Sequence, residues 1–137
     1  MTDEALTSAL ADLRASANAA AEPRPLPTEQ QVDDAQAALG CKFPPEYRRY
    51  LLEASDVVRP PVEPYTIAVV GSFNDLRAGA RDAWGGVVPR DQLPFCEHDG
   101  NYYCLTPEGV IRLWNKAGVT DTEWPDLASW IRGVWLT

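Results

Sequence analysis

The chain has 137 residues, of which 45% are hydrophobic, and its formal net charge at pH 7 is −8. This length suits a single domain with its own core, and the apolar content is that of an ordinary globular protein. The acidic residues are spread along the whole chain, which disfavours binding to DNA, RNA or an anionic membrane, because phosphate groups are bound by clustered lysine and arginine. The same charge favours a basic partner or serves solubility alone.

The three cysteines and the start of the chain indicate the compartment. No basic segment followed by an apolar stretch opens the sequence, and the cysteine count is odd. Together these features predict reduced thiols in a cytoplasmic protein. No run approaches the ~18 apolar residues of a membrane span.

The first predicted element is a helix over residues 3–20. Leu6, Leu10 and Leu13 recur at the spacing of one helical face. The stripe is thin and rich in alanine, which favours a helix held loosely beside the main domain. Three prolines within residues 23–27 then predict an extended linker. We therefore expect a helical extension (1–22), a proline-rich linker (23–27) and a main domain (28–137).

Two amphipathic helices are predicted next, over Glu29–Leu39 and Pro45–Glu53. Thr28 and Gln31 have the spacing of a capping box at the start of the first helix. Gly40 supplies the left-handed residue that ends it. Proline in the first turn of the second helix is tolerated, because that turn has no hydrogen bond to lose.

The signals between residues 55 and 90 are weaker. The nearly continuous apolar run Tyr65–Val70 predicts a central strand of a sheet. Ser72 can cap a short helix that runs through Leu76. The segment Gly79–Gly86 is predicted to be a loop, in which Trp84 stands beside two glycines.

The clearest pattern is a β-hairpin. Asp99-Gly100 stands between two runs rich in apolar and aromatic residues, which is the strongest short-range hairpin signal. A second turn at Thr106–Gly109 leads to a third strand, Val110–Trp114. The sequence therefore predicts three antiparallel strands, then a loop over Ala117–Glu123, and finally a helix that starts at Pro125.

Several of these motifs occur in a particular order and spacing. They are Leu39-Gly40, Phe43–Tyr47, Tyr50–Leu52, Leu93–Phe95, Asp99-Gly100, Tyr102–Leu105 and the closing segment around Leu127, Trp130 and Ile131. Each motif alone is common, but together, over residues 27–135, they resemble the SUKH superfamily. One departure is Glu53–Val57, which stands where the family often has Asn-Gly-Gly.

The resemblance implies an α+β fold, with helices packed on one side of a mostly antiparallel sheet and an extra N-terminal helix. It also implies a role. Bacterial members are mostly immunity proteins of polymorphic toxin systems, which bind a cognate toxin and block it. The resemblance therefore implies a protein that is not an enzyme, has no cofactor and binds a toxin encoded by an adjacent gene. The alternative is a regulatory or scaffold module without a toxin partner. The sequence says nothing about oligomeric state.

One cluster invites a different interpretation, namely a metal site or thiol catalysis. It consists of Cys96, His98, Asp99 and Cys104. No CxxC pair or HxxxH spacing supports zinc binding. His98 and Asp99 are neighbours on a strand, so their side chains are expected on opposite faces. We therefore predict that the cysteines are small core residues and that there is no metal or catalytic site.

The candidate partner-binding residues are acids and tryptophans expected in or near loops at the ends of the C-terminal strands. They are Trp84, Glu97, Asp99, Asp121, Glu123 and Trp124. Carboxylates beside tryptophan suit a basic protein partner, such as a nuclease toxin. Trp114 and Trp130 are expected in the core, and Trp124 is expected to be exposed because it precedes a proline in a polar loop.

Overall fold

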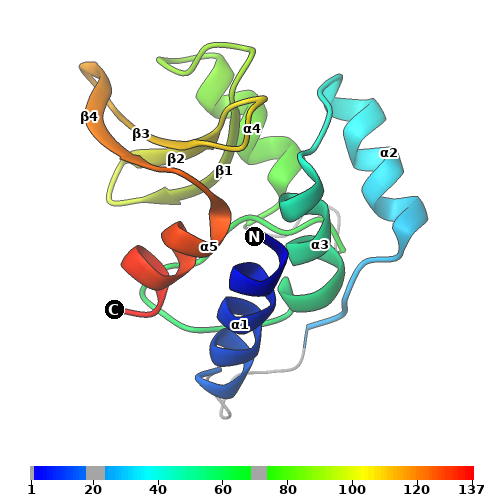
Figure 1. Cartoon of the computed structure of the whole chain (residues 1–137). Coiled ribbons are helices and arrows are strands. Elements are labelled where there is room, and N and C mark those ends of the chain that lie inside the picture. Colours follow the sequence, from blue (N-terminus) through cyan, green and yellow to red (C-terminus); the bar gives the residue numbers. More distant parts are fainter. Residues whose placement is uncertain (1, 18–23, 69–73) are drawn as a thin grey trace.

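The structure is a computed structural model and describes residues 2–17, 24–68 and 74–137 (Figure 1). In chain order the elements are α1 (Thr2–Ala15), α2 (Glu29–Leu39), α3 (Pro45–Ala54), α4 (Leu76–Trp84), β1 (Leu93–His98), β2 (Asn101–Leu105), β3 (Ile111–Asn115), β4 (Gly118–Trp124), α5 (Leu127–Trp130) and the π-helical turn η1 (Ile131–Trp135). The predicted α+β class with an antiparallel sheet and an N-terminal helix is confirmed. None of the helices in the described ranges is long and apolar enough to cross a membrane.

The four strands form one antiparallel meander in the order β1-β2-β3-β4. The hairpin predicted at Asp99-Gly100 is confirmed, and both residues have positive φ, 53° and 82°. This is the backbone that a two-residue turn with the twist of the strands requires. The next turn closes through a 2.9 Å hydrogen bond from the Gly109 amide to the Thr106 carbonyl.

The loop predicted over residues 117–123 is wrong, because these residues form the fourth strand, β4. Gly118 has φ 123°, and the Asn115 side chain accepts a 2.8 Å hydrogen bond from the Ala117 amide. These two features close a tight turn that returns the chain along β3. Because β4 is an edge strand with mostly polar residues, its sequence lacks the apolar run that marks a buried strand.

Two predictions in the middle of the chain are also wrong. Residues 65–68 form no strand: Thr66 makes an isolated bridge to Asp75, and residues 69–73, including Ser72, lie outside the described residues. The segment predicted as a loop from Gly79 is the body of α4, which Asp75 caps. Glycine fits inside this helix because the Tyr65 ring lies against it, and a Cβ on Gly79 would stand 2.3 Å from that ring.

The first helices follow the sequence signals closely. The capping box of Thr28 and Gln31 is present at the start of α2, and Gly40 ends the helix with φ 67°. α3 begins at Pro45, as predicted. The Phe43 ring meets the Tyr47 ring edge-on at 5.4 Å, which fixes the angle at which the chain enters α3.

The main core lies between one face of the sheet, here called the inner face, and the helices α1, α3, α5 and η1 (Figure 1). Trp130 stands at its centre, with its ring centroid 4.8 Å from that of Phe95 and 5.3 Å from that of Tyr103. Trp130 and Trp135 are each 1% exposed, so the prediction that Trp130 is a core residue is confirmed.

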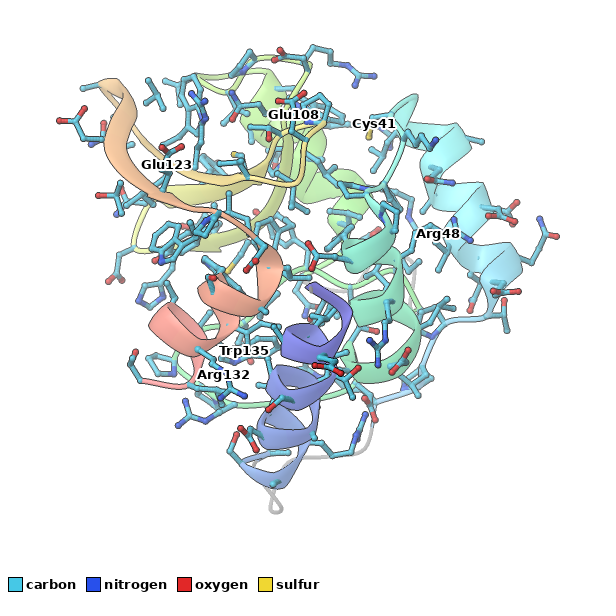
Figure 2. All side chains as sticks on the ribbon, in the orientation of Figure 1. Cys41, Arg48, Glu108, Glu123, Arg132 and Trp135 are labelled. Carbon is cyan, nitrogen blue, oxygen red and sulfur yellow. The ribbon has the colours of Figure 1, made fainter. Side chains whose placement is uncertain are left out.

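Helix α1 belongs to this core. Leu6 and Leu13 are fully buried, and the Arg14 guanidinium contacts Asp56 at 2.6 Å. Arg132 of η1 contacts Asp12 at 2.9 Å (Figure 2). The helix is therefore packed against α3 and α5 and is not held loosely. The division into an extension, a linker and a main domain stays a prediction.

The opposite face of the sheet, here called the outer face, is covered only in part. A small cluster of Ala83, Val88 and Cys104 packs there, with Trp84, Tyr102 and Trp114 around it. α4 connects the two sides, because Leu76 and Ala80 lie in the main core while Ala83 lies in the small cluster. The outer face over β3 and β4 stays open to solvent.

Candidate functional site

A row of four side chains crosses the outer face from β1 to β4. The strand register places Glu97 opposite Tyr102, Tyr102 opposite Trp114, and Trp114 opposite Val119. Neighbouring strands lie about 4.8 Å apart, so the row is about 14 Å long. Glu97 is exposed, Tyr102 and Trp114 are half-buried, and Val119 is 50% exposed. We call these four residues the outer-face row.

Gln92 holds the aromatic part of the row in place. Its side-chain oxygen accepts a 2.9 Å hydrogen bond from the Trp114 indole, and its backbone carbonyl accepts a 2.8 Å bond from the Trp84 indole. The Arg90 guanidinium lies 3.9 Å above the Trp84 ring and donates a 2.6 Å bond to the Leu39 carbonyl at the end of α2. The Trp114 ring is thus fixed by a chain of contacts that reaches the helical layer.

Carboxylates surround the row. Burial, followed by the negative charges of Glu97 and Asp82, raises the pKa of the Tyr102 hydroxyl, which shows that both acids act on this tyrosine. The register places Glu123 opposite Arg112 and Val119 opposite Trp114, so Glu123 lies on the outer face with Val119. Asp121 is exposed in the bulge of β4 between them. Between residues 93 and 126 the chain has six acidic and two basic residues, a net charge of −4. The sheet therefore presents an acidic surface around two aromatic rings.

Comparison with known proteins assigns the chain to a family. A family model described as SMI1-KNR4 cell-wall (SUKH_5) matches residues 6–136. The chain belongs to the SUKH family. The family membership predicted from the motifs is thereby confirmed, and the matched residues include most of α1.

A solved structure supports the fold of this SUKH domain. The crystal structure of a protein from Pseudomonas syringae pv. tomato is 32% identical in sequence and superposes with a TM-score of 0.90. The alignment covers 95% of this chain and 98% of that chain. A comparison with curated proteins returned no match.

Two of the six sequence-predicted site residues, Glu97 and Glu123, lie on the outer face of the SUKH domain, and a third, Asp121, is exposed in the bulge of β4. Glu97 also accepts a 2.9 Å hydrogen bond from the Gly100 amide at the hairpin tip. Glu123 stands 3.9 Å from Arg112, and both side chains are exposed (Figure 2). All three carboxylates are exposed and so can meet a partner.

The other three predicted residues lie elsewhere. Asp99 is exposed at the hairpin tip, where His98 stands 3.4 Å from its carboxylate. Trp84 is half-buried beneath Arg90. Trp124 lies on the inner face, half-buried against Tyr103 at 5.6 Å, so the predicted exposure of its ring is only partial.

The sequence prediction missed Tyr102 and Gln92 and assigned Trp114 to the core. Trp114 is half-buried against the small cluster of the outer face. A signal was present for the aromatic pair, because Tyr102 and Trp114 each alternate with inner-face residues of their strands. No local pattern marks Gln92, since its role depends on two indoles that are 30 residues apart in the sequence.

The cluster considered for metal or thiol chemistry is split by the sheet. Cys96 belongs to the main core and Cys104 to the small cluster on the opposite face. Burial raises the pKa of the Cys96 thiol to about 12 and that of Cys104 further still. Within the described ranges, no group of three histidine, cysteine or acidic side chains is placed to hold a metal ion.

An open groove of about 720 Å³ runs beside α2 and α3. Three cations, Lys42, Arg48 and Arg49, and two carboxylates line it, and both arginines are paired: Arg48 contacts Asp33 at 3.0 Å, and Arg49 contacts Glu53 at 2.8 Å (Figure 2). The groove therefore has little net charge to offer a ligand, in contrast to the acidic outer face.

Proposed function

We propose that this SUKH domain is an immunity protein that binds a cognate bacterial toxin in the cytoplasm and neutralises it. Membership of a family with this role among bacteria supports the proposal, over residues 6–136. The observation that carries it is the acidic outer face, where carboxylates surround two half-buried aromatic rings. Aromatic residues within a charged rim are typical of the residues that dominate protein–protein binding.

The domain would act by occlusion and not by chemistry on the toxin. A preformed acidic face covers a basic active surface, such as that of a nuclease toxin, and keeps its substrate away. The charge of the sheet accelerates encounter with such a partner, so the association rate falls as salt concentration rises. This mechanism requires no cofactor.

The first test is co-expression with the product of the adjacent upstream gene, followed by co-purification and a growth assay. A toxic neighbour that forms a 1:1 complex and is silenced supports the proposal. If neither complex nor protection is observed, the immunity role is rejected in favour of a regulatory or scaffold module.

A charge-reversal variant then tests the surface. The predicted acids Glu97, Asp99, Asp121 and Glu123 are reversed together, and the matched control reverses four exposed acids of the helices: Glu4, Glu29, Asp33 and Asp34. We expect the first variant to bind the toxin much more slowly and the control to associate at near the wild-type rate, because steering depends on where the charge lies. Equal effects of both variants would reject a specific acidic binding face.

A further inference from the structure

We propose that the outer-face row is the energetic centre of toxin binding, and that it receives a segment of the toxin that carries arginine. In this arrangement Tyr102 and Trp114 form the contact surface for the arginine side chain, and Glu97 at the β1 end of the row binds its guanidinium. The inference rests on the proposed function and specifies where and through which side chains the partner is bound.

The row collects apolar surface that is scarce elsewhere. Among the described residues only three large hydrophobic side chains are exposed: Leu26 at 42%, Val87 at 38% and Val119 at 50%. The most exposed of them, Val119, lies directly opposite Trp114. The register thus joins one valine and two aromatic rings into a continuous strip, and such strips mark contact sites.

The strip is also preorganised. The Trp114 indole donates its hydrogen bond to Gln92, whose backbone simultaneously fixes Trp84. A side chain that is already ordered loses little entropy when a partner binds it. Trp114 therefore has the two properties of a binding hot spot, a large ring surface and a fixed position.

The charges around the strip select an arginine. Glu97 is directly opposite Tyr102, so its carboxylate lies beside the aromatic end of the strip. A guanidinium can stack on an aromatic ring and donate paired hydrogen bonds from its edge to a carboxylate, whereas a lysine ammonium offers a single point charge. The cation on this part of the face, Arg112, already has Glu123 beside it at 3.9 Å.

The free edge of β4 is a poorer docking site than the face. Between the pairs Arg112–Glu123 and Trp114–Val119, β3 advances two residues and β4 advances four, so β4 is bulged. The Thr122 amide bonds to the Thr120 hydroxyl at 3.2 Å. Bulges and charged residues on an edge strand oppose the addition of another strand. A second copy of this chain would bring acidic residues against acidic residues, which favours a basic partner instead.

The test uses the toxin obtained in the co-expression experiment and measures its dissociation constant with the full chain. Val119→Lys places a cation on the row, and Leu26→Lys replaces a similarly exposed aliphatic side chain by lysine outside the sheet. We expect Val119→Lys and Tyr102→Ala each to weaken binding by at least about 30-fold, the size of a hot-spot contribution. Leu26→Lys should change the affinity by less than about 3-fold, the range of neutral surface contacts.

The outcomes separate this inference from the proposed function. If the wild-type chain protects the cell and binds the toxin while Val119→Lys and Tyr102→Ala keep near wild-type affinity, the immunity role stands and the row is rejected. The row is equally rejected if Val119→Lys only converts a dimer of this chain to a monomer, as measured by light scattering. Circular dichroism of each variant confirms that a loss of affinity does not come from unfolding.

Discussion

The two cysteines buried on opposite faces of the sheet predict a loss of stability in mildly basic solution. Burial raises the pKa of Cys96 to about 12 and raises that of Cys104 as well, because a thiolate is poorly solvated there. In the unfolded chain both thiols ionise near their ordinary pKa of about 8.5. The folded state therefore keeps protons that the unfolded state releases. The contribution of the two thiols to the free energy of unfolding is complete below pH ~8.5 and is lost as pH rises towards 12.

The size of the effect follows from this difference in pKa. Between pH 8 and pH 10 the unfolded thiols become ionised while the folded ones stay protonated, which lowers the free energy of unfolding by about 2 kcal/mol for each thiol. The two thiols together remove about 4 kcal/mol, a large part of the 5–15 kcal/mol that stabilises a typical domain. The buried tyrosines act in the same direction, but only above pH ~10, where unfolded tyrosine ionises.

Urea unfolding at pH 8, 9 and 10 in the presence of a non-thiol reductant measures this loss. The double variant Cys96→Ala/Cys104→Ala should be less stable at pH 8, because of its cavities, yet nearly insensitive to pH over this range. Cys41→Ala is the matched control and should keep most of the wild-type dependence, since Cys41 is only half-buried. A wild-type stability that does not change between pH 8 and 10, or a double variant that declines as steeply as the wild type, would refute the reasoning.

Three further substitutions test the packing. Tyr47→Phe should leave the free energy of unfolding unchanged or raise it by about 1 kcal/mol, because the buried Tyr47 hydroxyl has no hydrogen-bond partner among the described residues. A loss of more than about 1 kcal/mol in urea unfolding would show that the hydroxyl does have a hydrogen-bond partner. Gly79→Ala should lower the free energy of unfolding by about 1–3 kcal/mol, because the added Cβ displaces the Tyr65 ring. Helix propensity alone predicts a rise in stability, so a measured rise would contradict this contact. Leu13→Ala should lower the free energy of unfolding, measured in urea, by about 2–5 kcal/mol. A loss below about 1 kcal/mol would mean that α1 is not part of the core.

The features that could be predicted from the sequence are those set by neighbouring residues. The capping box at Thr28, the left-handed Gly40 and the turn at Asp99-Gly100 all depend on interactions within about four residues. The family resemblance also rests on such motifs, because their order persists even where each alone is common. Hence α2, α3 and the first three strands were found at nearly their observed positions.

The errors arise where distant residues decide the local structure. Gly79 signals a loop, yet it lies inside α4. Glycine is present there because the Tyr65 ring occupies the space that a side chain would need. β4 is mostly exposed and has few apolar residues, so no apolar run marks it in the sequence. It is a strand because it pairs with β3. The candidate site shows the same limit. Acids could be found in the sequence, but the alignment of Glu97, Tyr102 and Trp114 in one row depends on strand register, which is fixed by tertiary packing.

The contact between α1 and the C-terminal helices bears on when this protein becomes functional during its synthesis. Arg132 bonds to Ser8 and pairs with Asp12, and Leu6 shares the main core with Trp130. Ribosomes release a chain from its N-terminus, so α1 emerges long before the residues that cover its apolar face. α1 can pack against α3 earlier, but its apolar face is fully covered only when residues 127–135 have been translated. The fold, and with it the outer face, is therefore complete only once the last residues of the chain have left the ribosome.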